Sequence, residues 1–339
     1  MRARSVAILL FLLPALVPVV MAGAGERAAE LIRENSGALV FIENSDGSGS
    51  GFVCTIGGRK FVVTNQHVIA GTQGVRFTLL DREPLKTGAA AAASGHDIMT
   101  FAADAAPRAM EMMAGVEKEA AVGDEVAVLG NAEGARVIRP FVGKLVGIGP
   151  NLVEVSAEFV PGNSGSPIVH LKSGKVIGVA TYAVVRQIDS LTGRRNPQVR
   201  RFGFRLDSVK QWQPVVWAAY NEEFLAISKV QARTADLADL LNDIGADGRI
   251  DVERHKNDAI RRPLEKFVEA TSRKGLNERD RTRAVQDLMA TMRTACQSDV
   301  SQAQQRVRYD FFARALGDEG KVRTEFYKVF DAILKEGRR

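Results

Sequence analysis

Short apolar runs separated by glycine-containing turns cover the chain from about residue 38 to about residue 206. They are rich in Val and Ile and lie at residues 38–42, 51–55, 61–64, 75–80, 98–102, 125–129, 145–148, 152–155, 168–169, 176–184 and 202–206. Many short strands with turn signals between them are typical of a sandwich or a barrel rather than of βαβ units. The pattern therefore predicts an all-β domain, which we place at residues 25–228.

The texture of the sequence changes after about residue 228. Glycines become rarer, charges of both signs are mixed, and apolar residues recur at helical spacing, as at Leu237, Leu240 and Leu241. We therefore predict an α-helical domain at residues 229–339, without a role that the sequence identifies. Two further helices are predicted at 26–34, leading into the β domain, and at 207–227, closing it.

The N-terminal segment has the order of a secretory signal peptide. Arg2 and Arg4 supply a positive start, residues 6–20 are mostly apolar, and small residues at 22–24 offer a cleavage site. A retained membrane anchor is the alternative, but the apolar run is short for a spanning helix. We predict a signal peptide at residues 1–24 and an exported protein, periplasmic or secreted, with no stable membrane insertion once the signal is removed.

Composition limits the classes of partner. The chain has 339 residues, a formal net charge of +6 and only 6% aromatic residues, too few to suggest stacking platforms for nucleic acid. No nucleic-acid partner is therefore expected. The two cysteines, Cys54 and Cys296, form no disulfide framework, and the sequence leaves open whether they pair.

One segment of the tail, residues 243–251, echoes part of a calcium-binding loop. Gly245 stands where that pattern wants Asp or Asn, and Arg254 stands where it wants Glu. A turn at the end of a helix is the simpler interpretation. We predict no metal and no cofactor.

Three residues of the β region have the chemistry of a nucleophile and its helpers. Ser164 lies in a tight turn between Gly162 and Gly165, His67 directly follows an apolar strand, and Asp97 stands at the entrance of another. A serine hydroxyl needs a base, and a histidine base needs a carboxylate to orient it. Each residue alone has an ordinary interpretation as a loop or surface residue. Their occurrence at strand ends of one all-β stretch favours a catalytic triad.

The motifs around these residues together resemble the trypsin/chymotrypsin-like serine peptidases, and most nearly bacterial HtrA/Deg proteases and glutamyl endopeptidases. They lie at residues 47–53, 63–68, 96–98, 129–131 and 162–167, and the resemblance covers about residues 36–222. It implies a chymotrypsin-like double six-stranded barrel with His67, Asp97 and Ser164 as the triad. It also implies an oxyanion hole formed by the N–H groups of Gly162 and Ser164. The tail shows no recognisable PDZ pattern.

An α/β-hydrolase is excluded by the sequence around the serine. That fold needs glycine where Ser166 stands, and its histidine follows the nucleophile.

Substrate preference stays open at this stage. The resemblance puts Glu158 at the base of the primary specificity pocket, where a buried acid would select Lys or Arg. Arg205 could neutralise Glu158, which is the simpler interpretation, or face the opening and favour an acidic residue. Thr181, Tyr182 and Ala183 resemble the strand that holds an extended substrate by β-pairing.

Three other residues bear on the site. His96 is expected to point away from Asp97, on the opposite face of an extended strand. His170 is expected at the surface. Asn163 cannot form the ion pair by which digestive relatives are activated, so we predict activity without zymogen cleavage.

The sequence thus predicts an exported serine endopeptidase that cleaves protein or peptide substrates through an acyl-enzyme. The alternative is a catalytically silent, peptidase-like binding or scaffold protein that acts through its helical tail. In either case the tail is a candidate for a protein partner or for self-association. The presence of all three triad residues and both flanking glycines favours the peptidase.

Overall fold

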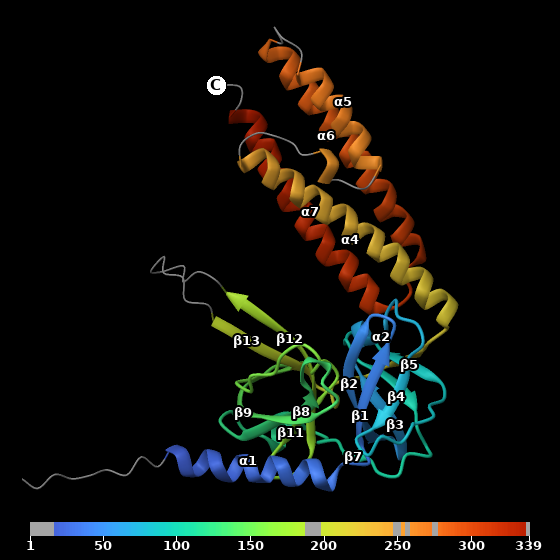
Figure 1. Cartoon of the computed structure of the whole chain (residues 1–339), viewed down its shortest axis with the longest axis vertical. Helices are drawn as coiled ribbons and strands as arrows, with labels where there is room; N and C mark the ends of the chain where they lie inside the picture. Colours follow the sequence, from blue (N-terminus) through green and yellow to red (C-terminus); the bar gives the residue numbers. More distant parts are fainter. Residues whose placement is uncertain (1–16, 187–197, 247–251, 255–257, 273–276, 337–339) are drawn as a thin grey trace, which may run out of the picture. The chain divides into compact units, whose positions relative to one another are not determined.

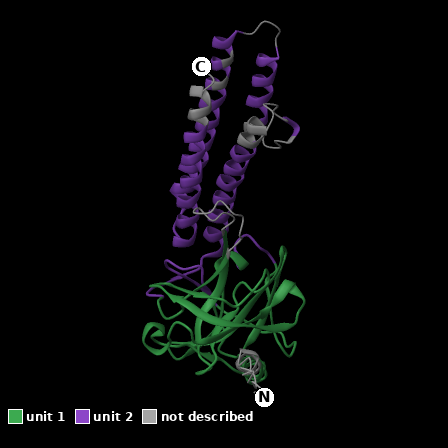
Figure 2. Ribbon diagram, turned by 90° about the vertical axis from the view of Figure 1, so that its left-hand side faces the viewer, with its two compact units in different colours: residues 1–68, 74–88, 100–208 green, residues 69–73, 89–99, 209–339 purple. Residues whose placement is uncertain are grey.

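A computed structural model describes residues 17–186, 198–246, 252–254, 258–272 and 277–336 (Figure 1). The chain divides into two units (Figure 2). Unit 1 comprises residues 1–68, 74–88 and 100–208, and unit 2 comprises residues 69–73, 89–99 and 209–339. Each unit is described by itself below.

Six strands of unit 1 close into an antiparallel barrel in the order β10-β13-β12-β11-β8-β9. They are β8 (Glu125–Asn131), β9 (Ile138–Ile148), β10 (Leu152–Val155), β11 (Pro167–His170), β12 (Val176–Arg186) and β13 (Gln198–Phe204). Closure pairs every strand on both sides over part of its length and so removes exposed sheet edges there. This barrel confirms the chymotrypsin-like fold for the second half of the β domain.

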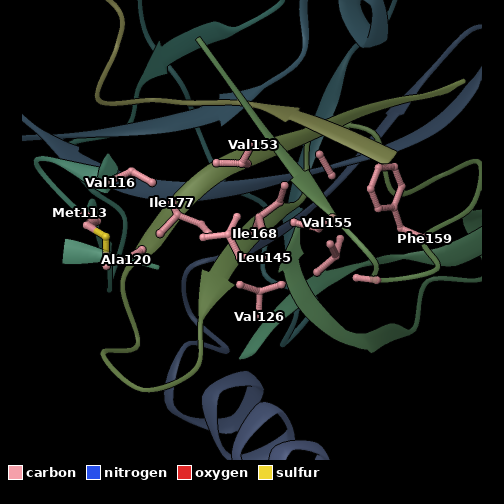
Figure 3. Close-up of a cluster of buried hydrophobic side chains, with 13 residues drawn as sticks. Met113, Val116, Ala120, Val126, Leu145, Val153, Val155, Phe159, Ile168 and Ile177 are labelled. Carbon is pink, nitrogen blue, oxygen red and sulfur yellow. The ribbon is translucent and has the colours of Figure 1, made fainter. Parts of the chain in front are cut away.

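The barrel interior is a cluster of buried apolar side chains, most of them small or branched (Figure 3). Val126 and Val128 of β8, and Val153 and Val155 of β10, lie two residues apart and are buried. Alternate residues of a strand point to the same face, so each strand contributes every second side chain. In β8 the residues between them are buried as well, which accounts for the continuous apolar run of this segment.

The earlier strands of unit 1 form an open sheet in the order β4-β1-β2-β3-β6, with β7 parallel to β2. They are β1 (Leu39–Asn44), β2 (Gly47–Ile56), β3 (Arg59–Thr64), β4 (Arg76–Leu79), β6 (Met99–Ala102) and β7 (Met110–Glu111). The short elements of this unit are α2 (Gln66–Ile69), α3 (Val116–Glu119) and η1 (Ala132–Gly134).

An open sheet stands where the resemblance implied a first closed barrel. The outer edge of β4 is occupied by the segment that follows it: Leu79 N donates to Glu83 O, Leu85 N donates to Phe77 O, and Pro84 bridges Thr78. Because this segment folds back on β4, the edge has no place for another strand.

Helix α1 (Val17–Glu34) packs against the barrel through a narrow apolar stripe. Ala24, Ala28 and Leu31 are buried at spacings of four and three residues, which puts them on one helix face. Arg27 reaches the carbonyl of Leu171. The helix predicted at 26–34 is therefore confirmed. The predicted signal peptide overlaps the start of α1, and its first sixteen residues lie outside the described part.

Unit 2 contains a helical region, as predicted. Its helices are α4 (Trp217–Ala246), α5 (Asp258–Thr271), α6 (Glu278–Arg306) and α7 (Asp310–Glu336), with the short turn η2 (Val252–Arg254). Their shared core consists of Leu237, Leu264, Leu288, Met289, Met292, Cys296 and Phe326. Arg233 and Asp299 form a buried ion pair at 3.0 Å. None of the described helices pairs the length of a bilayer span with a sufficiently apolar sequence.

The boundary predicted after residue 228 falls inside α4, and the two compact units divide after Ser208. The helix predicted at 207–227 also begins later. Residues Trp212–Pro214 form a strand, β14, which pairs with β5 (Ala90–Ala93) inside unit 2. Pro214 ends that strand, and no Gly or Pro interrupts the chain from Trp217 until Gly245, so one helix continues across the predicted boundary.

Both cysteines are buried free thiols. Burial raises the pKa of Cys54 to about 12, which keeps it protonated and inert, as expected of a small apolar core residue. Among the described residues no group of three or more His, Cys, Asp and Glu side chains could hold a metal ion. Residues 247–251 of the calcium-like segment lie outside the described part.

Candidate active site

Ser164 lies in the turn that connects β10 to β11, and two glycines give this turn its shape. Gly162 has φ +91° and Gly165 has φ +88°, in the left-handed region that favours glycine. A Cβ on Gly165 would lie 2.0 Å from the carbonyl oxygen of Ser50, and one on Gly162 would lie 2.4 Å from that of Asn131. Both positions therefore require glycine for conformation and for space.

Ser50 on β2 holds this turn at two points. Its N–H donates to the carbonyl of Ser164 (3.0 Å), and its hydroxyl donates to the carbonyl of Gly162 (2.8 Å). The same hydroxyl accepts from Asn131 N–H (2.9 Å), so β8 and β2 meet on one buried serine. The sequence motif included Ser50, but nothing in its local pattern indicated this bridging role.

The peptide N–H groups of the turn alternate between bonded and open. Those of Asn163, Gly165 and Ser166 donate to the carbonyls of Val160, Ala180 and Asn163. Those of Gly162 and Ser164 have no acceptor among the described residues, and neither does the half-buried Ser164 hydroxyl. Two unused donors therefore stand beside an accessible serine, which is the arrangement that a developing oxyanion requires.

His67 lies on the short helix α2, directly after β3, and its side chain is exposed. The helix is fixed on both sides: Asn65 donates to Thr181 Oγ1 (3.0 Å), and Asn44 donates to the carbonyl of Val68 (2.8 Å). Gly49 packs between this helix and the Ser164 turn, since a Cβ at Gly49 would lie 2.7 Å from Val68 and 3.6 Å from the carbonyl of Ser164. The helix with His67 and the turn with Ser164 thus share adjacent residues of β2 as their support.

Asp97 belongs to unit 2, so its placement is described within that unit. It is 8% exposed and lies in a bend just before β6. His96 is also buried, with its ring Nδ1 2.8 Å from the carbonyl of Ser94. The prediction of an extended strand at this pair is wrong, because the chain turns at Gly95, which has φ +73°.

The predicted pairing of Glu158 with Arg205 is wrong. Glu158 is exposed, whereas Arg205 is buried and pairs with Asp207 (2.7 Å) and with Glu117. Arg205 also donates to the carbonyl of Gly149 (3.0 Å). Its hydrogen bond with Asp207 is the main reason that its pKa is raised above the ordinary value. Arg205 pairs with the carboxylate of Asp207, only two residues along the chain, in a segment that the sequence pattern predicts to be helical.

We therefore expect Arg205→Lys to affect stability and not specificity. Lysine keeps the charge but cannot bind Asp207, Glu117 and Gly149 together, and the free energy of unfolding should fall by about 2 kcal/mol. Denaturant unfolding measures the loss. Cleavage-site profiles of the two proteins should coincide, and a changed residue preference before the cut would return Arg205 to the specificity pocket.

Thr181, Tyr182 and Ala183 lie on β12, and the register shifts between Ala180 and Tyr182. Thr181 is buried and donates to the carbonyl of Val179 (2.8 Å), while Tyr182 and Ala183 are exposed. Among the described residues β11 pairs with β12 only as far as Val179. The N–H of Gly165 donates to the carbonyl of Ala180 (2.9 Å), so this part of β12 lies next to the Ser164 turn.

The prediction that His170 lies at the surface is also wrong. His170 is buried, with Nε2 3.2 Å from Asp124 and Nδ1 2.9 Å from the hydroxyl of Ser173. All four residues of β11 are buried because the strand is central in the barrel and covered on both faces. Its partners make His170 a structural residue.

Comparison with known proteins shows which family this fold and serine turn resemble. Residues 49–179 match the family model of the trypsin-like peptidase domain. This match includes the Ser164 turn and supports a serine protease.

Individual relatives are of the HtrA/Deg type. The chain is 29% identical over 165 residues to "Protease Do-like 1, chloroplastic" of Arabidopsis thaliana, covering 44% of this chain and 36% of that protein. It therefore spans about a third of the length of this relative.

Two solved structures are also similar. The serine endoprotease from Yersinia pestis is 19% identical with a TM-score of 0.41, covering 52% of this chain and 62% of that one. The HtrA-type protease AlgW with tripeptide is 20% identical with a TM-score of 0.42, covering 54% and 60%.

Proposed function

We propose that this protein is an exported serine endopeptidase with Ser164 as nucleophile, His67 as general base and Asp97 as the acid that orients His67. The observation that carries the proposal is the serine turn. Its two unused N–H groups, at Gly162 and Ser164, flank an accessible hydroxyl in a backbone that only glycine permits. An ordinary glycine–serine loop has no reason to keep two donors open in this way.

In the proposed reaction, Ser164 Oγ attacks the carbonyl carbon of the scissile peptide bond while His67 takes the hydroxyl proton. The carbonyl oxygen becomes an oxyanion that accepts from the N–H groups of Gly162 and Ser164. Breakage of the C–N bond returns the proton from His67 to the leaving amine and leaves an ester on Ser164. Water then attacks the ester with His67 again as base, releasing the acid and restoring the serine.

The role of Asp97 rests on the order His67, Asp97, Ser164 along the chain and on the resemblance to the family. A carboxylate stabilises the imidazolium that forms in each step and holds the correct tautomer.

The proposed substrate is an extended polypeptide that adds to β12 by β-pairing at Tyr182 and Ala183, next to the Ser164 turn. Arg205 pairs with Asp207 and Glu117, so it does not neutralise the negative charge of Glu158. We propose that Glu158 favours Lys or Arg before the cleaved bond. Thr181 anchors this strand, because its hydroxyl accepts a hydrogen bond from the side chain of Asn65.

We further propose that activity needs no zymogen cleavage. Asn163 is buried, and its side chain donates to the carbonyl of Val160 (3.1 Å), so the chain itself holds this residue in the turn. A new N-terminal ammonium has no carboxylate at position 163 with which to pair. Export is proposed from the N-terminal sequence. N-terminal sequencing of the protein recovered from expressing cells should begin near residue 25, and an intact Met1 would contradict it.

The test is digestion of an unfolded protein, such as reduced casein, by the full uncleaved chain. Mass spectrometry of the fragments should find new termini with the wild type and none with His67→Gln, which keeps a polar side chain at the exposed position. The residue before each cut reports on Glu158. If well-folded wild type produces no fragments, the cleft is silent, and the alternative of a peptidase-like binding protein takes its place.

A further inference from the structure

The loop that contains Asp97 belongs to the same unit as the C-terminal helices. Residues 89–99 group with residues 209–339, although more than a hundred residues separate them along the chain (Figure 2). Contacts within unit 2 join residues 89–99 to the segment before α4 and to α7.

The first contacts are made by the strand that leads into the loop. β5 pairs with β14, with Ala93 opposite Trp212 and Ala91 opposite Pro214. The N–H of Ser94 donates to the carbonyl of Gln211 (3.0 Å), and that of Val215 donates to the carbonyl of Ala90 (2.9 Å). The segment just before α4 thus fixes the backbone up to three residues before Asp97.

The next contacts come from the start of α7. The Tyr309 hydroxyl accepts from Val216 N–H (2.9 Å) and donates to the carbonyl of Pro214 (3.2 Å). Arg314 donates to the carbonyl of Gly95, inside the loop itself. Helix α7 therefore holds the loop directly through Arg314 and indirectly through β14.

Helix α4 contributes Tyr220, the largest fully buried side chain of unit 2. Its ring packs on Tyr309 (centroids 5.0 Å apart) and Phe312 (4.8 Å). Burial raises the pKa of Tyr220, and the nearby charge of Asp97 raises it further, ahead of Tyr309 and Glu223. Tyr220 therefore packs against Tyr309, whose hydroxyl holds the segment just before α4 at Pro214 and Val216.

We infer that the helical unit positions the proposed catalytic aspartate, with Arg314 and Tyr309 as positioning residues: Arg314 bonds the loop at Gly95, and Tyr309 holds β14, which pairs with the strand leading into the loop. The inference rests on the proposed function for its catalytic consequence. It gives the C-terminal helices a role in the peptidase. They hold the loop that contains Asp97, and the resemblance to the peptidase family predicts no helix in this role.

The expected consequence is a loss of turnover without loss of substrate binding. A loosened Asp97 orients His67 less well and stabilises its imidazolium less. We expect kcat to fall by about 10-fold to 100-fold, by analogy with the loss seen when the outer partner of a metal ligand is removed. The acid limb of the kcat/KM profile should also move to lower pH, because the pKa of the histidine base falls when its carboxylate partner is less well placed. KM should stay within about twofold, since β12 and the Ser164 turn are untouched.

Other charged and titratable groups face this part of unit 2 and must be kept constant. They are His96 on the loop, and Tyr220 and Glu223 on α4. Glu223 accepts from the N–H groups of Arg308 and Tyr309, so it fixes the start of α7 and is left unchanged in the test.

The experiment compares Arg314→Gln and Tyr309→Phe, which removes the hydroxyl that bonds Val216 and Pro214, with two matched controls in the full chain. Lys321→Gln removes an exposed charge from the same helix, where Lys321 pairs only locally with Asp318. Tyr327→Phe removes a hydroxyl from a partly buried tyrosine of α7 that packs on the helical core. Hydrogen–deuterium exchange of the peptide covering residues 89–99 and the pH profile of peptide hydrolysis are measured for all five proteins.

Faster exchange of this peptide, by about 10-fold or more, is expected in the two test variants and in neither control. The same two variants should show the lower kcat and the shifted acid limb. Unchanged exchange overturns the inference whether or not the protein is a peptidase. Changed exchange with an unchanged pH profile in an active enzyme also overturns it, by reducing the contacts to a structural role. If wild type fails to hydrolyse peptides, the proposed function fails, and exchange alone then decides whether the helices hold the loop.

Discussion

Replacing Ser164 by alanine is expected to lower kcat for peptide hydrolysis by about 10⁴-fold to 10⁶-fold. The loss is large because Ser164 Oγ forms the covalent bond, so no acyl-enzyme can arise without it. The residual rate reflects the oxyanion donors and substrate binding alone. Steady-state hydrolysis of a fluorogenic peptide at saturating substrate measures the change, and KM should stay within a few-fold.

Ser166→Ala is the matched control. Its hydroxyl is fully buried two residues away and has no hydrogen-bond partner among the described residues. Removing a hydroxyl that is already unpaired is close to neutral for stability. Ser166→Ala should therefore retain activity within about threefold of wild type. Equal loss in both variants would show that the turn is merely sensitive to substitution and that Ser164 is not the nucleophile.

Gly165→Ala is expected to destabilise the protein by about 3 kcal/mol or more and to reduce hydrolysis in the fraction that stays folded. The left-handed conformation alone costs an alanine about 1–2 kcal/mol. In addition, its Cβ would lie 2.0 Å from the carbonyl oxygen of Ser50 and 2.4 Å from Thr64 Oγ1, so backbone must shift. The shift would move Ser50 away from the carbonyls of Ser164 and Gly162, which it holds. Denaturant unfolding followed by activity at equal folded concentration measures both effects.

Gly58→Ala separates strain from crowding. Gly58 has φ +80°, close to that of Gly165, but nothing lies within 4 Å of the Cβ that alanine would add. It should lose only the conformational strain, about 1–2 kcal/mol, and keep full activity. If the two variants lose equal stability, close packing around Gly165 does not support the turn.

The second barrel could be predicted from the sequence because its determinants are local. Alternating buried residues such as Val126, Val128, Val153 and Val155 produce apolar runs that any reader of the chain can find. The serine turn is equally local, since Gly162 and Gly165 are conspicuous on either side of Ser164. The helices of the tail follow from apolar spacing in the same way.

What could not be predicted depends on partners distant in the chain. The bridge at Ser50 joins residues about a hundred positions apart, and the pairing of β5 with β14 takes residues 212–214 out of a predicted helix. Arg205 was misassigned because Asp207 and Glu117 were not known to approach it. A local pattern predicts whether a side chain is buried or exposed, but it does not predict which distant residue that side chain contacts.

The measurement that tests the central claim most directly is labelling of the full chain with a fluorophosphonate probe, followed by mass spectrometry of the modified peptide. Such a probe reacts only with a serine whose hydroxyl is activated by a base and whose oxyanion is stabilised. The proposed mechanism predicts a single adduct on Ser164 that disappears in His67→Gln. An adduct on another serine, or no adduct on well-folded protein, would contradict it.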